Sequence, residues 1–331
     1  MKAGNLAPLL QGFFTERLLQ QQGASAHTVA SYRDTFRLLL AFASERLHKA
    51  PSGITMEELS PTFLGEFLRH LEVDRGNAVR TRNGRLSALR AFFRFVTMAE
   101  PGLALQCQQV LAVPAKRYDR HAVAFLDELE AAALLAAPDR RTWMGRRDRV
   151  LLLVAIQTGL RNTEITSLRW QDVGIGVGAH VKCLGKGRKT RCTPLRPDVA
   201  EALQQWFAEQ RGAPASPVFP SSRGGPLSAD ALQRLVIRHV STAYESCPTL
   251  AKKHVTPHTL RHTAAMDLLR RGVDLSVIAL WLGHESSETT QIYLHADMGI
   301  KEKALAHATL DGLVPGRYLP SDPLLAFLEG L

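Results

Sequence analysis

Apolar residues recur at three- and four-residue spacing through most of the first hundred residues, which restricts this part of the chain to helices. Two stretches show the pattern most clearly: Leu6, Leu9, Leu10, Phe13, Phe14 and Leu18, then Val29, Tyr32, Phe36, Leu39 and Leu40. Ser25 and the Ser60-Pro61 pair are predicted to cap helices, and Pro51-Ser52-Gly53 breaks the chain between them. We therefore predict a small all-helical domain of about four amphipathic helices.

The last of these helices, predicted over residues 78–98, carries arginines opposite its core face. The core face consists of Leu86, Leu89, Phe92, Phe93 and Val96. Arg80, Arg90 and Arg94 project from the other side, whereas Arg82 and Arg85 fall close to the apolar stripe. Either the helix begins later or these two side chains reach around its end. We take Arg80, Arg90 and Arg94 as candidate DNA-binding residues, although an arginine-bearing face is more often only solvated.

A break in the helical pattern separates this domain from the rest of the chain. Between residues 100 and 122 the sequence holds two prolines and a basic cluster: Pro101, Pro114, Lys116, Arg117, Arg120 and His121. Such a stretch is typical of an interdomain linker. We place the helical domain at residues 1–112, the linker at 113–122, the second domain at 123–311 and a C-terminal tail at 312–331.

The second domain is predicted to be mostly helical with one small antiparallel sheet. Helices are expected over residues 127–137 and 146–157. After Trp170 the period changes, and residues 179–184 and 190–195 are typical of two short strands joined by the turn 185–189. Further helices are expected over residues 197–211, 228–245, 257–271, 276–282 and 287–295.

Composition limits the classes to which the protein can belong. A chain of 331 residues exceeds a single typical core, so we expect two domains. Lys and Arg outnumber Asp and Glu by 41 to 31, a balance that fits either a nucleic-acid partner or a soluble protein that is merely basic. Four cysteines without a C-x-x-C pair suit a reducing cytosol. The longest aliphatic run, residues 150–156, cannot span a bilayer, so we expect a cytoplasmic protein without a membrane partner.

Four segments of the second domain carry the residues of a possible reaction centre. They are Thr158-Gly159-Leu160-Arg161-Asn162-Thr163-Glu164-Ile165, Leu184-Gly185-Lys186-Gly187-Arg188-Lys189, His258-Thr259-Leu260-Arg261-His262, and Leu282-Gly283-His284 followed nine residues later by Tyr293. In this order and spacing, with the tyrosine last, they closely resemble the tyrosine recombinase (phage integrase) family, which includes the Xer recombinases. The resemblance extends over both domains, from about Leu6 to Leu310.

Cleaving a phosphodiester without a metal requires fixed cations, because the phosphate is anionic and gains charge as it becomes five-coordinate. Arginine suits this role since its planar fork binds two oxygens and stays charged. The resemblance assigns this role to Arg161 and Arg261. It assigns His258 to hydrogen-bonding the phosphate and assisting proton transfer, and His284 to a hydrogen bond in the transition state. Taken singly, each of these residues is more often structural.

Tyr293 is the nucleophile that the resemblance implies, since the other four tyrosines lack its position after Leu-Gly-His. A phenol with a pKa near 10 must lose its proton during attack or lie where cations lower that pKa, and we expect the surrounding arginines and histidine to lower it. Lys186 matches the mobile general acid of the family, with Lys189 as a rival. Glu164 is expected to orient Arg161 or His258, and Thr163 stands where the family often has Ser.

The resemblance also implies an architecture and a reaction. It predicts a helical SAM-like core-binding domain and an integrase-type catalytic domain that close on opposite faces of duplex DNA. The implied enzyme is a site-specific recombinase that cuts and rejoins strands through a 3′-phosphotyrosyl link, without a metal or other cofactor. It would act as a tetramer on double-stranded DNA, with accessory recombinases or architectural proteins possible, in a mobile element or in plasmid or chromosome resolution.

Three other interpretations compete with this one. His258 and His262 are four residues apart, as zinc ligands often are, but Thr259 stands where a metalloprotease has glutamate. A basic DNA-binding regulator without catalysis would not need all six catalytic-type residues. Type IB topoisomerases share the chemistry, and here the tail favours a recombinase. Its apolar residues suit docking on a neighbouring protomer: Leu324, Leu325, Phe327, Leu328 and Leu331.

Overall fold

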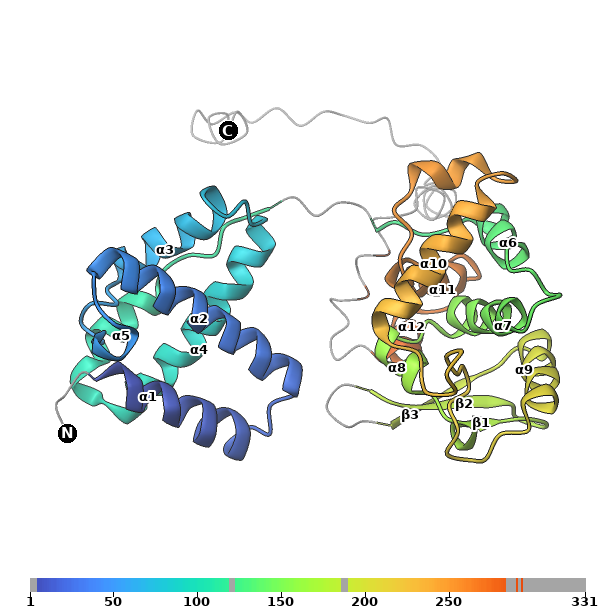
Figure 1. Cartoon of the computed structure of the whole chain (residues 1–331), viewed down its shortest axis with the longest axis horizontal. Helices are drawn as coiled ribbons and strands as arrows, with labels where there is room; N and C mark the ends of the chain where they lie inside the picture. Colours follow the sequence, from blue (N-terminus) through green and yellow to red (C-terminus); the bar gives the residue numbers. More distant parts are fainter. Residues whose placement is uncertain (1–4, 119–122, 186–189, 284–289, 291–292, 294–331) are drawn as a thin grey trace, which may run out of the picture. The chain divides into compact units, whose positions relative to one another are not determined.

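Helices make up the first of two units into which the chain divides, residues Met1–Arg120 and His121–Leu331. The computed structural model describes residues 5–118, 123–185, 190–283, 290 and 293 (Figure 1). The helices of the first unit are α1 (Leu6–Gly12), which continues as a π-helical segment (Phe13–Gln21), α2 (Ala26–Leu47), α3 (Pro61–Val73), α4 (Val79–Ala99) and α5 (Ala104–Leu111). The predicted caps are confirmed, because Ser25 accepts a hydrogen bond from the Thr28 amide and Ser60 accepts one from the Phe63 amide.

Aromatic rings from three helical segments form the core of the first unit. Phe13, Phe36 and Phe92 are buried, with ring centroids 5.1 to 6.2 Å apart in edge-to-face packing. Burial of each such ring contributes roughly 1.5–3 kcal/mol, and edge-to-face pairs add to it. Helix α4 contacts α1, α2, α3 and α5, so it lies at the centre of this unit.

The arginines of α4 divide into structural and exposed residues. Arg82 is buried and donates to the Pro114 carbonyl at 3.2 Å, and Arg85 donates to the Ser31 carbonyl at 2.9 Å. Both therefore hold neighbouring segments onto the helix, which explains why they fall near its apolar stripe. Arg90 is half-buried and donates to the Val113 carbonyl, while Arg80 and Arg94 are exposed.

The sequence predicted a break in the helical pattern over residues 100–122, but the first part of this stretch, which we had placed in the helical domain, is helical. Helix α5 lies within that stretch, and it packs against α4 with Cys107 and Val110 fully buried. Its eight residues are too few to establish a helical period in the sequence. After it, Lys116 pairs with Glu72 at 2.8 Å, so the chain stays attached to the first unit beyond α5.

The second unit holds a three-stranded antiparallel sheet at one side, and helices fill the remainder (Figure 1). The strands are β1 (Val173–Gly174), β2 (His180–Leu184) and β3 (Thr190–Pro194), in the order β1-β2-β3. Cys183 of β2 lies opposite Arg191 of β3. Both predicted strands are confirmed, whereas the two-residue β1 is too short to leave a period-two pattern.

The helices of the second unit begin and end close to the predicted residues. They are α6 (Glu128–Ala136), α7 (Trp143–Thr158), α8 (Asn162–Ser167), α9 (Pro197–Gln210), α10 (Ala229–Ala243), α11 (Pro257–Arg270) and α12 (Leu275–Leu282). Helix α8 was not predicted. Helix α7 begins three residues before the predicted position, because Thr142 caps it by accepting from the Gly145 amide. The helix expected over residues 287–295 lies outside the described residues except at 290 and 293.

Two buried clusters support these helices. The larger centres on α7, α9 and α10, where the buried Trp206 donates its indole N–H to the Val218 carbonyl at 2.8 Å. The smaller brings Ala265 and Met266 of α11 against Ile278 and Leu282 of α12, and Tyr293 is part of it. Within the described ranges, no helix is both long and apolar enough to cross a membrane.

Candidate active site

The end of α7 sets the position of Arg161. Gly159 ends this helix with φ +63°, and a Cβ added there would lie 2.6 Å from Leu282 Cδ2 and 3.1 Å from Ala264 Cβ. Only glycine tolerates both the left-handed backbone and this close approach of α11 and α12. Arg161 follows two residues later, directly before α8, so the turn places its guanidinium beside both helices.

Three hydrogen bonds fix Arg161. Its guanidinium donates to Glu164 Oε1 at 3.0 Å and to the Gly283 carbonyl at 2.7 Å. Its backbone N–H donates to Glu164 Oε2 at 2.7 Å. Glu164 was expected to orient either Arg161 or His258, and the structure shows it in contact with Arg161.

Arg261 extends from α11 toward the same helix end. It is 2% exposed and donates to the Gly159 carbonyl and the Leu282 carbonyl, each at 2.7 Å. Burial, together with the positive charge of Arg161, lowers its pKa to about 10. The Arg261 guanidinium therefore remains charged at neutral pH, and a bound anion would stabilise this buried charge.

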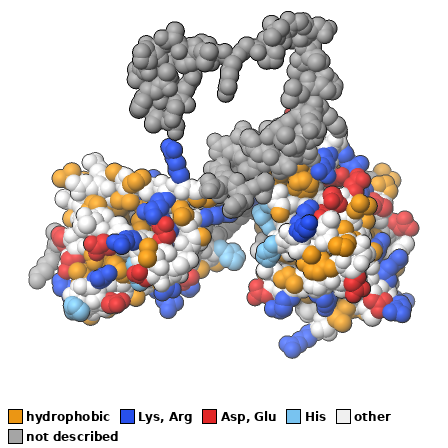
Figure 2. Space-filling model, turned by 90° about the horizontal axis from the view of Figure 1, so that it is seen from above, with side chains coloured by type: hydrophobic (Ala, Val, Ile, Leu, Met, Phe, Trp, Pro, Cys, Tyr) orange, Lys and Arg blue, Asp and Glu red, His pale blue; other side chains and the backbone are white. Residues whose placement is uncertain are grey.

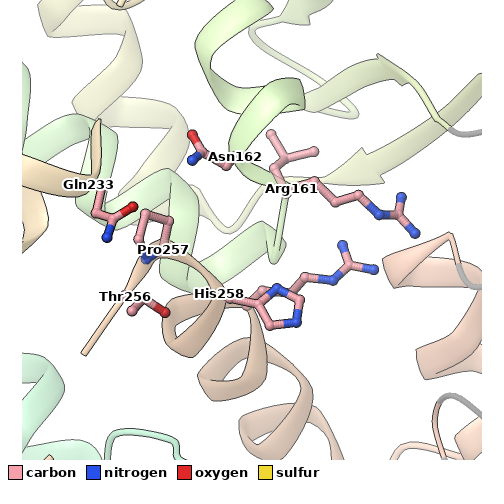
Figure 3. A pocket seen from close by; sticks show the side chains of 8 residues that line it. Arg161, Asn162, Gln233, Thr256, Pro257 and His258 are labelled. Atoms are coloured by element: carbon pink, nitrogen blue, oxygen red, sulfur yellow. The ribbon is translucent and has the colours of Figure 1, made fainter. Parts of the chain in front are cut away.

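Arg161, His258 and Arg261 line one cavity of about 260 Å³. The remaining lining residues are Leu160, Asn162, Gln233, Thr256 and Pro257. In the view of Figure 3, Arg161 and His258 lie at one side of the cavity and Gln233, Pro257 and Thr256 at the other. Two guanidinium groups and an imidazole at one concave surface form a binding site for an anion with several oxygens, such as a phosphodiester.

Tyr293 is buried, and its hydroxyl lies against α11. Its Oη is 2.9 Å from His262 Nδ1, and the residue is 1% exposed. Burial raises the pKa of Tyr293 to about 12, and the charge of Arg261 offsets only part of that increase. The expectation that surrounding cations lower this pKa is therefore wrong for the described conformation, because desolvation of the phenolate outweighs their attraction.

His262 connects the phenol to the cavity. Its ring packs edge-to-face on His258, with centroids 4.4 Å apart. His258 lines the cavity and His262 contacts Tyr293 Oη, so the two histidines of α11 connect the cavity to the phenol. The sequence showed His262 only as a possible zinc ligand. Among the residues that the structure describes, no group of three or more His, Cys, Asp or Glu side chains gathers at one point.

Arg191 is a second residue that the sequence motifs did not indicate. It forms a two-pronged ion pair with Glu164, Nη1 to Oε1 and Nη2 to Oε2, both at 2.8 Å. Burial by itself would raise the pKa of Glu164, but the hydrogen bonds from Arg191 and from the Arg161 backbone, with the charges of both arginines, lower it to about 2. Glu164 is therefore ionised throughout the physiological range.

Other predicted site residues either lie outside the described residues or belong to the first unit. Lys186, its rival Lys189 and His284 fall in the undescribed segments. Of the arginines proposed to bind DNA, Arg80 and Arg94 are exposed while Arg90 is engaged by Val113, and their contact with DNA stays a prediction. On the face shown in Figure 2, Lys and Arg side chains are interspersed with acidic ones on each unit.

Two family models match the chain in separate parts. Residues 124–299 match the model described as phage integrase family, and residues 12–100 match the phage integrase N-terminal SAM-like domain. The protein y4rC of Sinorhizobium fredii, which is named as an integrase/recombinase, is 51% identical over 330 residues, which are 100% of this chain and 99% of that protein. Tyrosine recombinase XerC of Pelobacter propionicus is 31% identical over 298 residues, 88% of this chain and 93% of the relative.

Solved structures share the fold at lower identity. A XerH site-specific recombinase in a post-cleavage complex with its difH substrate gives a TM-score of 0.66 at 21% identity, over 86% of this chain and 81% of that one. The Tn1549 transposon integrase in complex with transposon right-end DNA gives 0.67 at 15% identity, over 91% of this chain and 99% of that one.

Proposed function

The chain belongs to the phage integrase family of tyrosine recombinases, and on that premise we propose that it cuts and rejoins DNA at specific sites through a bond between Tyr293 and the 3′ phosphate. The observation that carries the proposal is the cavity lined by Arg161, His258 and Arg261. It offers fixed positive charge where a phosphodiester gains negative charge, next to a helix that holds a tyrosine hydroxyl.

In the first step, the scissile phosphate enters the cavity. Arg161 and Arg261 each keep two donors on protein carbonyls or Glu164, which fixes the planes of both guanidinium groups before DNA arrives. A preorganised pair of this kind stabilises the five-coordinate phosphorus without the cost of reorienting at the moment of reaction. His258, exposed at the cavity, donates to a further phosphate oxygen.

In the second step, Tyr293 Oη forms a bond to phosphorus and the bond from phosphorus to the 5′ oxygen breaks. The phenolic proton passes to His262, which already shares a hydrogen bond with Oη. Lys186 is the proposed donor of the proton that the departing 5′ oxygen takes up, with Lys189 as the alternative. The phosphotyrosyl bond retains the energy of the phosphodiester, so a 5′-hydroxyl of another strand reverses the step without ATP.

The depth of Tyr293 separates DNA binding from cleavage. Because the residue is 1% exposed, we propose that its hydroxyl reaches a phosphate in the cavity through a shift of Tyr293 toward it. We propose that assembly on DNA drives this shift, which would restrict cutting to complete complexes.

The remaining parts of the proposal concern the assembly. The SAM-like part, residues 1–112, and the catalytic part, residues 123–311, would bind opposite faces of one duplex, joined by the linker 113–122. Four protomers on two DNA sites would exchange strands, with the tail 312–331 contacting a neighbouring protomer. Accessory recombinases or architectural proteins are compatible with this scheme, and both a mobile element and plasmid or chromosome resolution fit it.

Covalent capture tests the proposal. The protein is incubated with DNA from its own genetic locus in buffer containing EDTA, denatured rapidly, and the DNA that remains bound to protein is sequenced. We expect cleavage at one short sequence with protein on the 3′ side, and a nicked duplex of that sequence should trap the adduct. Absence of covalent DNA with every locus fragment, from protein that binds DNA, would contradict the proposal.

A further inference from the structure

Arg191 lies at a junction of three elements, β3, α8 and α12, each of which is near a proposed catalytic residue in the sequence. It belongs to β3, and Lys186 precedes this strand by four residues in the sequence. Its guanidinium pairs with Glu164 of α8, next to Arg161, and its Nε donates to the Trp281 carbonyl of α12 at 3.1 Å. The side chain is 12% exposed and is not among the described residues that line the cavity. A direct contact with a bound phosphate is therefore not its role.

Glu164 is shared between two arginines, and this sharing controls Arg161. Oε1 accepts from both Arg161 Nη1 and Arg191 Nη1, while Oε2 accepts from the Arg161 backbone and from Arg191 Nη2. Because both oxygens are held by Arg191, the carboxylate cannot rotate away from this geometry. It presents Oε1 to Arg161 Nη1, while Arg161 Nη2 donates to the Gly283 carbonyl, so both contacts orient the guanidinium that lines the cavity.

Arg191 also lies against the C-terminal end of α12. A Cβ added at Gly283 would lie 2.8 Å from Arg191 Nη1, and Gly283 has φ +65°. The Gly283 carbonyl accepts from Arg161, and the neighbouring Leu282 carbonyl accepts from Arg261. One side chain thus contacts the same helix end that fixes both proposed phosphate-binding arginines, directly before His284.

The charges give the arrangement a further consequence. Arg161, Arg191 and Arg261 carry three positive charges against the single negative charge of Glu164, which leaves two net positive charges beside the cavity. Without Arg191, Glu164 would neutralise Arg161 in a closed pair, and one net charge would remain. A phosphate that must bind Arg161 would then compete with Glu164 for it.

We infer that Arg191 is a positioning residue for strand cleavage, which fixes Glu164 so that Arg161 keeps its orientation and its charge for the scissile phosphate. The inference rests on the proposed function, because it concerns the same reaction. Arg191 acts through Arg161, so its importance depends on the negative charge of the substrate phosphate.

The test compares two nicked duplexes of the captured target sequence, one with a phosphodiester and one with an uncharged methylphosphonate at the scissile position. Single-turnover cleavage by Arg191→Met should fall about 10- to 100-fold on the phosphodiester. On the methylphosphonate, where one negative charge is absent, the loss relative to wild type should be within about threefold. DNA affinity should stay unchanged, and Arg191→Lys, which keeps the charge but not the two-pronged contact, should fall between wild type and Arg191→Met.

Arg147→Met is the matched control. Arg147 is 6% exposed, makes a comparable pair with Asp148 at 2.7 Å and donates to the Pro220 carbonyl, away from the cavity residues. Arg147→Met should slow cleavage of both substrates equally, in proportion to the folded fraction measured by circular dichroism. If Arg191→Met does not fold, Arg191→Lys must show the same substrate dependence. Equal losses on the two substrates, or wild-type rates, would overturn the inference, whereas failure of wild type to cleave either substrate would refute the proposed function itself.

Discussion

Burial raises the pKa of Tyr293 to about 12, above the ordinary value near 10, so its phenolate is scarcer at neutral pH than that of an exposed tyrosine. Without a proton acceptor, the reactive phenolate would be scarce at neutral pH. Below pH 12 its fraction would increase tenfold with each unit by which the pH rises. His262, 2.9 Å from the hydroxyl, is the acceptor in the proposed mechanism. We expect His262→Gln, which can hydrogen-bond but cannot take up a proton near neutral pH, to slow cleavage about 100-fold at pH 7 and to make the rate rise with pH. Single-turnover cleavage between pH 6 and 9 measures this, and a variant with the wild-type rate and pH profile would exclude His262 as the acceptor.

Glu164 couples pH to stability through the same cluster. Its pKa is about 2 in the folded protein against an ordinary value of 4.5, so folding favours the charged form. The resulting stabilisation is present above pH 4.5 and is lost as the pH falls toward 2. We expect Glu164→Gln to lower the free energy of unfolding by about 3 kcal/mol at pH 7 and by clearly less at pH 3. Urea unfolding at both pH values measures the difference, and an equal loss at both would contradict the assignment.

Single residues were predictable where the chemistry requires a residue type within a motif. Arg161, His258 and Arg261 come together at one cavity as the motif order implied. Arg191 and His262 could not be ranked from the sequence, because their importance arises from contacts across the fold, Arg191 with Glu164 twenty-seven residues earlier and His262 with Tyr293 thirty-one residues later. The burial of Tyr293 could not be predicted either, since its spacing after Leu-Gly-His carries no information about desolvation.

At the scale of elements, α4 shows how one helix carries both structural and exposed arginines. Arg82 and Arg85 are engaged by carbonyls of the first unit, as is Arg90, whereas Arg80 and Arg94 remain exposed. Helical periodicity predicted the apolar face of α4 correctly, but it placed Arg90 on the exposed face, whereas this residue is half-buried. It could not predict α5, α8 or β1, whose eight, six and two residues are too short to establish a period.

The exposed arginines of α4 lead to a prediction about salt. If they bind phosphates, Arg80→Ala and Arg94→Ala should each weaken DNA binding and reduce the slope of log affinity against log salt by about one. Arg90→Ala is the control on the same helix. Because its guanidinium is engaged by Val113, we expect its loss to lower stability and to leave the salt slope within about 0.3 of wild type. Fluorescence anisotropy from 50 to 300 mM salt, about the range where such contacts are screened, gives the slopes. Identical slopes for all three variants would contradict this division of roles.

At the scale of the whole molecule, sequence patterns predicted two units and a mostly helical second unit with a small sheet. Assembly depends on surfaces that meet only between protomers, so no intrachain pattern determines it. We expect deletion of residues 312–331, which removes the apolar side chains of the tail, to leave cleavage of a nicked single site within about threefold of wild type but to abolish strand exchange between two sites. Gel analysis of both reactions on the captured sequence measures this, and full recombination by the truncated protein would show that the tail has no role in assembly.

The central claim is that the hydroxyl of Tyr293 becomes bonded to DNA within the arginine cluster. The most direct measurement is peptide mass spectrometry of the trapped adduct after digestion by protease and nuclease, with Tyr293→Phe in parallel. The account predicts a nucleotide-bearing peptide that contains Tyr293, and no adduct from the variant even though it binds the same DNA with wild-type affinity. A nucleotide on any other residue, or an adduct formed by Tyr293→Phe, would contradict it.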